Sequence, residues 1–154
     1  MLYSSASKYA VRALSYMTEC IDQTVFTVDE LAKGANVPKP YLSKILKQLV
    51  SGKILKSSKG PGGGYQFARS VDKISLYDIK VTIDGIQEFV DCVLGLDACN
   101  DAAPCPAHFM WKELRAQTTV ALQTTTLPVA QRIMHEKALH PEGAKKRTQK
   151  KRLQ

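Results

Sequence analysis

Three cysteines and one histidine lie close together in the sequence, at Cys92, Cys99, Cys105 and His108. Thiolate and imidazole groups are preferred ligands of zinc, copper(I) and iron–sulfur clusters. Three thiolates and one imidazole supply the four protein bonds that such a site needs. We therefore expect these four residues to form the metal or cluster site of the chain, within a segment that we call the cysteine loop, residues 84–108.

This ligand set leaves other interpretations open. Three thiolates and an imidazole also suit a tetrahedral zinc ion, and a cysteine by itself is most often a small buried side chain. Cys20 lies outside the cysteine loop, and we interpret it in the second way. Trp111, which follows the loop, is expected in the core or in a dimer contact. His135 and His140 have no predicted role.

The positive charge of the chain is concentrated in two segments. The formal net charge is +8, and residues 31–71 contain eight basic residues and no acidic residue. Residues 141–154 contain six basic residues and one acidic residue, so the rest of the chain has a net charge of −5. A basic segment without acidic residues is typical of a nucleic-acid-binding surface. The two features together favour a metal-sensing site joined to a DNA-binding surface.

Length and composition indicate one globular domain followed by a tail. The chain has 154 residues, of which 44% are hydrophobic, and this is enough for one compact core. No apolar run is long enough to span a membrane, and the N-terminus lacks the apolar segment of a signal peptide. We therefore expect a cytoplasmic protein. In that reducing compartment, clustered cysteines favour metal binding or redox chemistry over structural disulfides.

The N-terminal half has the pattern of three helices. A first, mostly buried helix is expected to begin near Ser4, Ser5 and Ser7. Thr27 and Glu30 have the spacing of a capping box, which predicts the start of a short second helix. A third helix is predicted to end at Gly52. The second and third helices, joined by a tight turn, predict a helix-turn-helix. The core face of the third helix has apolar residues at the i, i+3, i+4 and i+7 positions, namely Leu42, Ile45, Leu46 and Leu49.

The outer face of the third helix and the hairpin after it form the predicted DNA-binding surface. The helix carries lysines and hydrogen-bonding side chains that suit a major groove, and Ser43 and Gln48 are expected to contact bases. Two strands, expected over residues 54–57 and 64–68, flank a glycine-rich tip that suits contact with a minor groove or phosphates. An ordinary solvated lysine face is the alternative. The predicted DNA-binding residues are Lys39, Tyr41, Ser43, Lys44, Lys47, Gln48, Lys56, Lys59, Gly60, Gly62 and Gly63.

The C-terminal half is predicted to connect the cysteine loop to a long helix. Ser75 and Asp78 predict the start of a helix that ends near Asp84. After the cysteine loop, a long helix is expected from about His108 to about Thr125. Its apolar side favours dimerisation, with packing on its own domain as the alternative.

These elements predict a mainly α fold, in which a winged helix-turn-helix domain is followed by a long C-terminal dimerisation helix. The expected boundaries are residues 1–83 for the winged helix-turn-helix DNA-binding region and 84–108 for the cluster-binding loop. Residues 109–140 are expected to form the dimerisation helix and its return, and residues 141–154 a disordered basic tail.

Four segments together resemble a known family. They are residues 7–14, the predicted third helix at 41–49, the glycine-rich hairpin tip at 59–65 and the cysteine loop. Their combination resembles the bacterial Rrf2 family of winged-helix transcription regulators, which includes the IscR, NsrR and RirA types, over residues 1 to about 135. The resemblance implies a homodimer that binds a roughly palindromic operator. It also implies an iron–sulfur cluster that senses iron–sulfur status, redox state or nitric oxide.

The ligand pattern is most similar to the IscR type. The resemblance then implies a 2Fe-2S cluster, with a 4Fe-4S cluster and zinc as the alternatives, and His108 resembles the histidine that completes the cluster in that type. Lys8 replaces the N-terminal aspartate that serves the NsrR type. Cys92 and Cys99 are separated by one residue more than is usual in the IscR type. Three neighbouring carboxylates could also reach a cluster, those of Asp91, Asp97 and Asp101.

Three classes of function follow from these patterns. The leading hypothesis is a dimeric DNA-binding regulator controlled by a cluster; it is not an enzyme, because no Ser-His-Asp or paired-carboxylate arrangement is present, and it has no membrane partner. The second is a cluster-free or zinc-bound regulator of the same fold, controlled by a protein or small-molecule partner. The third is a redox enzyme or electron carrier built on the cysteines, which leaves the basic helix and hairpin unexplained.

Overall fold

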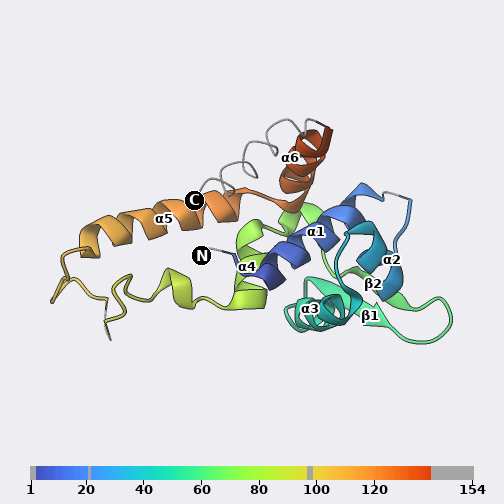
Figure 1. Cartoon of the computed structure of the whole chain (residues 1–154), viewed down its shortest axis with the longest axis horizontal. Helices are drawn as coiled ribbons and strands as arrows, with labels where there is room; N and C mark the ends of the chain where they lie inside the picture. Colours follow the sequence, from blue (N-terminus) through green and yellow to red (C-terminus); the bar gives the residue numbers. More distant parts are fainter. Residues whose placement is uncertain (1–2, 21, 97–98, 140–154) are drawn as a thin grey trace, which may run out of the picture.

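The chain folds around its first helix, which packs against four of the other helices (Figure 1). The computed structural model describes residues 3–20, 22–96 and 99–139, so the predicted basic tail lies outside the described residues. In Figure 1, α5 projects away from the body of the molecule, and α6 returns to pack on α1. The helices are α1 (Ser5–Glu19), α2 (Val28–Gly34), α3 (Lys39–Ser51), α4 (Leu76–Asp84), α5 (His108–Thr124) and α6 (Leu127–Leu139), with short 3₁₀ helices η1 (Val71–Lys73) and η2 (Gln87–Phe89). The strands are β1 (Leu55–Ser58) and β2 (Gly64–Phe67).

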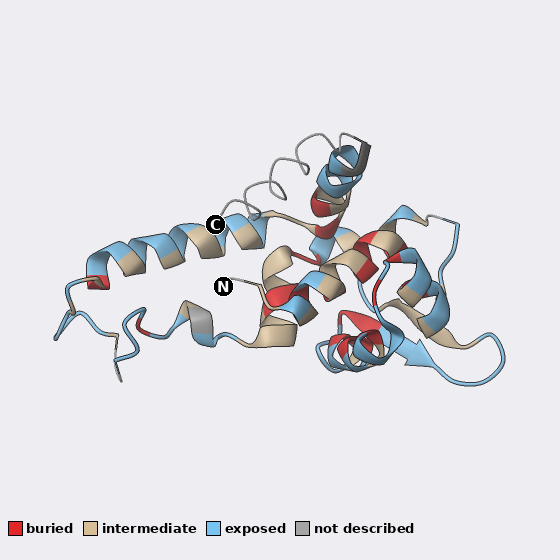
Figure 2. Ribbon diagram, viewed as in Figure 1, coloured by how far each residue is buried: buried red, intermediate tan, exposed pale blue. Residues whose placement is uncertain are grey.

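The hydrophobic core lies between α1, α2, α3, α4 and the hairpin, and Leu127 at the start of α6 belongs to it. Ala10, Ala13 and Leu14 of α1 are completely buried. Figure 2 shows buried residues on the facing sides of α1 and α3. Each fully buried aliphatic side chain contributes about 1.5–3 kcal/mol. None of the described helices has both the length and the apolar composition needed to cross a lipid bilayer. The four predicted core residues of α3 are all buried, namely Leu42, Ile45, Leu46 and Leu49.

Two capping boxes begin helices where the sequence predicted them. The backbone N–H of Thr27 donates to Oε2 of Glu30 at 2.7 Å, and the N–H of Glu30 donates back to Oγ1 of Thr27 at 3.3 Å. Ser75 and Asp78 make the same reciprocal bonds at the start of α4, at 2.9 and 3.1 Å. Each box satisfies backbone donors that a helix start leaves without an intrahelical partner.

The end of α3 differs in detail from the prediction. The helix ends at Gly52, as expected, but that glycine has an ordinary φ of −79°. The left-handed residue is Lys53, with φ 56°, and the N–H of Ile54 donates to the carbonyl of Leu49 at 3.0 Å. Gly52 is required for packing instead, because a Cβ there would lie 2.4 Å from Cγ2 of Thr82 on α4.

The antiparallel hairpin pairs Leu55 with Phe67 and Ser58 with Gly64. Phe26, in the connection before α2, extends the pairing: its N–H and carbonyl exchange hydrogen bonds of 2.9 and 2.8 Å with Tyr65. Backbone hydrogen bonds therefore attach this hairpin, the wing of the fold (residues 55–67), to the start of the helix-turn-helix.

A buried ion pair joins the end of α4 to the start of α1. Nζ of Lys80, whose side chain is 1% exposed, lies 3.0 Å from Oδ2 of Asp84. The Asp84 carboxylate also accepts hydrogen bonds from the hydroxyls of Ser4 and Ser7 and from the backbone N–H of Ser4. Ser4 is the N-cap of α1, and Tyr3 beside it donates to the carbonyl of Leu76 at 2.7 Å. Charge-assisted hydrogen bonds therefore hold the two helix ends together.

The ionisation of Asp84 follows from this network. Burial acts to raise its pKa, but the hydrogen bonds from Ser4, Ser7 and Lys80 outweigh burial and hold the pKa below its ordinary value. Burial, together with the charge of Asp84, raises the pKa of Tyr3 to about 12. The carboxylate is therefore ionised at neutral pH, opposite the buried ammonium group.

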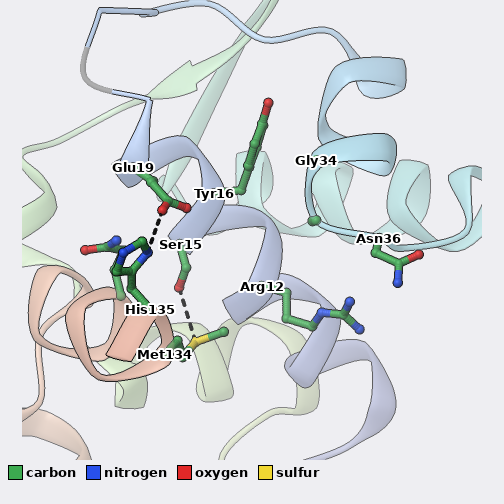
Figure 3. Close-up of a pocket in the computed structure, with 10 residues that line it drawn as sticks. Arg12, Ser15, Tyr16, Glu19, Gly34, Asn36, Met134 and His135 are labelled. Atoms are coloured by element: carbon green, nitrogen blue, oxygen red, sulfur yellow. Dashed lines mark hydrogen bonds and ion pairs between the residues drawn. The ribbon is translucent and has the colours of Figure 1, made fainter. Parts of the chain in front are cut away.

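Helix α6 packs against α1 beside the turn that joins α2 to α3. The hydroxyl of Ser15 donates to Sδ of Met134 at 3.6 Å, and Nδ1 of His135 lies 2.9 Å from Oε1 of Glu19 (Figure 3). An open hollow of about 320 Å³ lies between these helices, and Asn36 in the α2–α3 turn also lines it. The last described helix of the chain therefore lies next to the helix-turn-helix.

Substitution of Asp84 by Asn tests the buried ion pair. Removing the carboxylate takes away the negative charge that lies 3.0 Å from the buried Lys80 ammonium group, so we expect the free energy of unfolding in urea to fall by about 3 kcal/mol at neutral pH. The folded-state pKa of Asp84 is lowered, so its contribution is complete above the ordinary pKa of an aspartate and is lost as pH falls through the lowered value. The difference between wild type and variant should therefore shrink in acid. The exposed Asp22→Asn is the control, and equal stability of wild type and Asp84→Asn at neutral pH would contradict this account.

Candidate metal centre and nucleic-acid interface

The cysteine loop lies alongside the N-terminal part of α5. The loop leaves α4 at Gly85, whose φ of 82° lies in the left-handed region that favours glycine. It then returns to the first residue of α5 (Figure 1). Nε1 of Trp111 donates to the backbone carbonyl of Asp91 at 2.9 Å, which attaches the outgoing part of the loop to α5.

The four predicted metal ligands come together in two pairs. The sulfur atoms of Cys92 and Cys105 lie 3.9 Å apart. Sγ of Cys99 lies 3.5 Å from Nδ1 of His108. In the described part of the chain, no three His, Cys, Asp or Glu side chains lie close enough together to hold a single metal ion. Cys20 packs against the hydrophobic core, in agreement with its interpretation as a small core side chain.

His108 is held in a defined orientation by the residues around it. Its side chain is 3% exposed, and Nε2 lies 2.7 Å from Oδ1 of Asp101. Asp101 also pairs with Nζ of Lys112 at 2.7 Å. The Lys112 ammonium group, followed by His108, holds the pKa of Asp101 below its ordinary value. When the carboxylate accepts a hydrogen bond from the Nε2–H group, Nδ1, which faces Cys99, is the nitrogen available to a metal.

The loop backbone favours the thiolate form of Cys92. The backbone N–H groups of Leu96 and Leu94 donate to its sulfur, and these bonds, together with the Cys105 thiol and the Arg115 charge, hold the pKa of Cys92 below its ordinary value. The thiolate is the form of cysteine that binds metals. This loop conformation therefore prepares Cys92 for metal binding.

One face of α5 supplies contacts that the sequence analysis missed. His108, Trp111, Lys112 and Arg115 follow the i, i+3, i+4 and i+7 spacing of a single helix face, and all four contact the cysteine loop. Trp111 was expected in the core or in a dimer contact, but among the described residues its indole N–H binds the loop. The spacing was visible in the sequence and could have identified this face. Of the three carboxylates considered as ligands, Asp101 binds His108, Asp91 binds α5 through its backbone, and Asp97 lies outside the described residues.

The remaining sides of α5 and the loop expose large apolar side chains. Phe109 is 67% exposed and Leu114 is 46% exposed. Figure 2 shows exposed residues along the length of α5. Large contiguous apolar surfaces on a single chain are typical of interaction sites. The other exposed apolar residues of this region are Met110 and Val120 on α5 and Ile86, Val90, Val93, Leu94 and Leu96 in the loop.

The outer face of α3 is open to solvent. Lys44, Lys47 and Gln48 are exposed, and Tyr41 is 64% exposed. Two other predicted DNA-binding residues have contacts within the protein. Nζ of Lys39 lies 2.6 Å from Oδ1 of Asp29 on α2, and the hydroxyl of Ser43 donates to the carbonyl of Lys39 at 3.0 Å. Lys44 and Lys47 are therefore the more available cations of this face, and the Ser43 hydroxyl offers only its lone pairs to a ligand.

The glycines at the tip of the wing have different structural requirements. Gly60 and Gly62 have φ values of 88° and 75°, in the region that favours glycine, and no atom lies within 4 Å of where a Cβ would be. Gly63 is confined instead, because its Cβ would lie 2.5 Å from the carbonyl oxygen of Ser58. The tip formed by Gly60 and Gly62 is thus open to another molecule, whereas Gly63 closes the turn. Both wing lysines, Lys56 and Lys59, are exposed.

Comparison with known sequences identifies related proteins over most of the chain. Residues 3–131 match the model of the Rrf2 family, described as iron-dependent transcriptional regulator. An HTH-type transcriptional regulator of Aquifex aeolicus is 34% identical over 129 residues, which cover 82% of this chain and 89% of that protein. A second, of Mycobacterium tuberculosis, is 34% identical over 128 residues, with coverage of 82% and 79%. The HTH-type transcriptional regulator IscR of Pectobacterium carotovorum is 25% identical over 129 residues, with coverage of 82% and 77%.

Solved structures share the fold. CymR, the global cysteine regulator of B. subtilis, superimposes with a TM-score of 0.69 at 20% identity and covers 86% of this chain and 98% of its own. IscR of T. potens superimposes with a TM-score of 0.64 at 20% identity, with coverage of 90% and 88%. Together with the mainly helical architecture, these similarities confirm the predicted winged helix fold.

Proposed function

The chain belongs to the Rrf2 family of DNA-binding transcription regulators, and we propose that it is a homodimer whose binding to operator DNA is controlled by an iron–sulfur cluster. The observation that carries this proposal is the pairing of four soft ligands beside α5, in the same chain as an exposed basic helix and wing. The relatives described above are regulators rather than enzymes, in agreement with the sequence prediction. An operator-binding protein of this kind acts in the cytoplasm.

The proposed cluster ligands are Cys92, Cys99, Cys105 and His108. Each iron of a two-iron cluster takes two protein ligands, and the pairs at 3.9 Å and 3.5 Å match that requirement. A zinc ion needs four ligands around one point, and a four-iron cluster takes one ligand on each iron, so the pairing supports a 2Fe-2S cluster over both alternatives. When bound, the cluster would supply a redox-active centre that iron shortage, oxidants or nitric oxide can alter.

The surrounding residues prepare the ligands for that group. Asp101, itself fixed by Lys112, holds the Nε2 proton of His108, so that the ring presents Nδ1 towards Cys99. The backbone N–H groups near Cys92 favour its thiolate form. The protein therefore contributes the orientation and the ionisation state of the donor atoms.

The proposed DNA contacts are divided between α3 and the wing. We infer that α3 enters the major groove, with Lys44 and Lys47 on phosphates and Gln48 on a base edge. Lys59 and the open glycines Gly60 and Gly62 would approach a minor groove or the backbone. Lys39, Tyr41, Ser43, Lys56 and Gly63 complete the proposed surface, with Lys39 partly neutralised by Asp29.

A second copy of the chain is the proposed partner of α5. This helix projects from the body and exposes Phe109, Met110, Leu114 and Val120, which the described residues of one chain leave uncovered. A two-fold contact between two α5 helices would cover these side chains. It would also place two helix-turn-helix units on one DNA duplex, about 34 Å apart, as a palindromic operator requires.

Alanine substitution of the cysteines tests the cluster. Protein purified without oxygen should absorb visible light, and Cys92→Ala, Cys99→Ala and Cys105→Ala should each abolish the absorption by removing an iron ligand. Cys20→Ala, in the core, is the matched control and should keep the spectrum. A colourless wild-type protein that contains stoichiometric zinc would disprove the iron assignment.

Lysine substitutions test the DNA-binding surface, with a duplex that the protein itself selects from a random-sequence library. Lys44→Ala and Lys47→Ala should weaken binding to all sequences alike and reduce the slope of log affinity against log salt by about 1 each. Gln48→Ala should change base preference at one position, at a cost of about 1–3 kcal/mol. Lys137→Ala on α6 is the control. Unchanged affinity and slope in both α3 lysine variants would show that this surface does not bind DNA.

Substitution of exposed apolar residues of α5 by glutamate tests the proposed dimer. Met110→Glu combined with Leu114→Glu would place carboxylates in the interface, and light scattering should then report a monomer where the wild type is a dimer. Ile133→Glu, at a similarly exposed apolar residue of α6, is the control and should remain dimeric. A monomeric wild type, or a dimeric α5 variant, would contradict the assignment.

A further inference from the structure

The cysteine loop contains several acidic residues but obtains its positive charge from α5. Residues 81–111 contain no lysine or arginine. Lys112 and Arg115, one turn apart on α5, lie over this acidic and thiol-rich segment. Lys112 binds Asp101, as described above. Arg115 is half-buried and has a different set of partners.

The guanidinium group of Arg115 contacts two separate parts of the loop. Its Nη1 donates to the backbone carbonyl of Val90 at 2.8 Å and lies 3.4 Å from that of Asp91, immediately before Cys92. Its Nη2 lies 3.6 Å from Sγ of Cys99, within hydrogen-bonding distance of sulfur. One side chain therefore connects the segment that carries Cys92, a member of one ligand pair, to Cys99, a member of the other pair.

We propose that Arg115 is a positioning residue of the metal centre, which holds the Cys92 and Cys99 segments on α5 and donates a charged hydrogen bond to the Cys99 sulfur. The proposal rests on the proposed function, because it assigns Cys92 and Cys99 as ligands. Bonds to the backbone fix the loop whether or not metal is present. The bond to sulfur offsets the negative charge that thiolate ligands bring to the site.

The contacts require an arginine rather than any cation. The planar guanidinium group donates in two directions from separate nitrogens, so it can bind carbonyl oxygens and a sulfur at the same time. A lysine has a single ammonium nitrogen on a flexible chain and can satisfy only one of these partners well. Arg115→Lys therefore separates the effect of charge from the effect of the two-directional contact.

The first experiment compares hydrogen exchange in the metal-free protein. Wild type, Arg115→Gln, Arg115→Lys and the control Arg132→Gln, at an exposed position of α6, are studied by mass spectrometry of peptides that cover residues 87–96. Both Arg115 variants should exchange faster than wild type over this segment, because the Val90 carbonyl loses its hydrogen bond to α5 and the Asp91 carbonyl keeps only the one from Trp111. Arg132→Gln should match wild type. Urea unfolding checks that each variant is folded, and if one Arg115 variant is unstable, the other is still compared with wild type.

The second experiment measures the site with metal bound. Hydrogen bonds to metal ligands from neighbouring residues typically contribute 10- to 100-fold to metal affinity. The Zn²⁺ affinity of Arg115→Gln, measured in competition with a chelator, should therefore be lower than that of wild type by about this factor. In protein that carries an iron–sulfur cluster, Arg115→Gln should also have a more negative reduction potential, because the sulfur loses a charged hydrogen bond. Arg115→Lys should have a reduction potential between those of wild type and Arg115→Gln, because it keeps the positive charge. It should still lose the protection of residues 87–96 from hydrogen exchange.

The outcomes separate this proposal from the proposed function. A wild-type protein that holds zinc but no cluster would end the iron–sulfur assignment, while exchange and Zn²⁺ affinity would still decide the role of Arg115. If the wild type held no metal, the exchange comparison alone would decide it. Unchanged exchange over residues 87–96 in both Arg115 variants would overturn the positioning role, whatever metal is present.

Discussion

The buried ion pair between Lys80 and Asp84 determines where the second half of the chain begins. A lysine buried to this extent is tolerated only when its charge is balanced, and Asp84 contributes to that balance while it also binds Ser4 and Ser7 at the start of α1. The end of α4 therefore has one position relative to the helix at the centre of the core. The path of the cysteine loop turns away from that fixed point at Gly85, so the placement of the thiols relative to the helix-turn-helix depends on the charge pair at the end of α4.

Local sequence signals predicted the helices well because the interactions behind them are local. A capping box joins residues three positions apart: the predicted box at Thr27 and Glu30 forms with reciprocal hydrogen bonds, and Ser75, predicted to start α4, forms a second box with Asp78. The periodicity of α3 likewise identified its buried face. The end of α3 shows the limit of local signals. Gly52 does end the helix, but a glycine is needed there because Thr82 packs against it. The residue with left-handed backbone conformation is Lys53. The contact of Gly52 with Thr82 is between residues far apart in the sequence, which no local pattern encodes.

For the candidate metal site, the sequence indicated which residues could bind metal but not how they are arranged. The four candidate ligands were identifiable from residue type and spacing, because few kinds of side chain bind zinc or iron–sulfur clusters. Their pairing depends on the path of the loop, and the contacts of Asp101, Lys112 and Arg115 depend on which side of α5 the loop follows. The helical spacing of His108, Trp111, Lys112 and Arg115 was present in the sequence, but it indicates a shared face without indicating what that face meets. On the DNA-binding side, the exposure of α3 was predictable, whereas the capture of Lys39 by Asp29 required the two helices to be placed.

The length of α5 determines how far the helix rotates when its His108 end is displaced. The helix has 17 residues, which corresponds to about 25 Å, and it is hinged to the body where the carbonyl of Thr125 accepts from Leu76 and the N–H of Leu127 donates to Ile74. A displacement of about 1 Å at the His108 end turns a rod of this length by only about 2°. Sub-ångström changes in bond length at the thiols are therefore too small to reorient the helix. The geometry favours a stimulus that rearranges the whole loop, such as gain or loss of the proposed cluster, over one that only changes the charge of a cluster that stays in place.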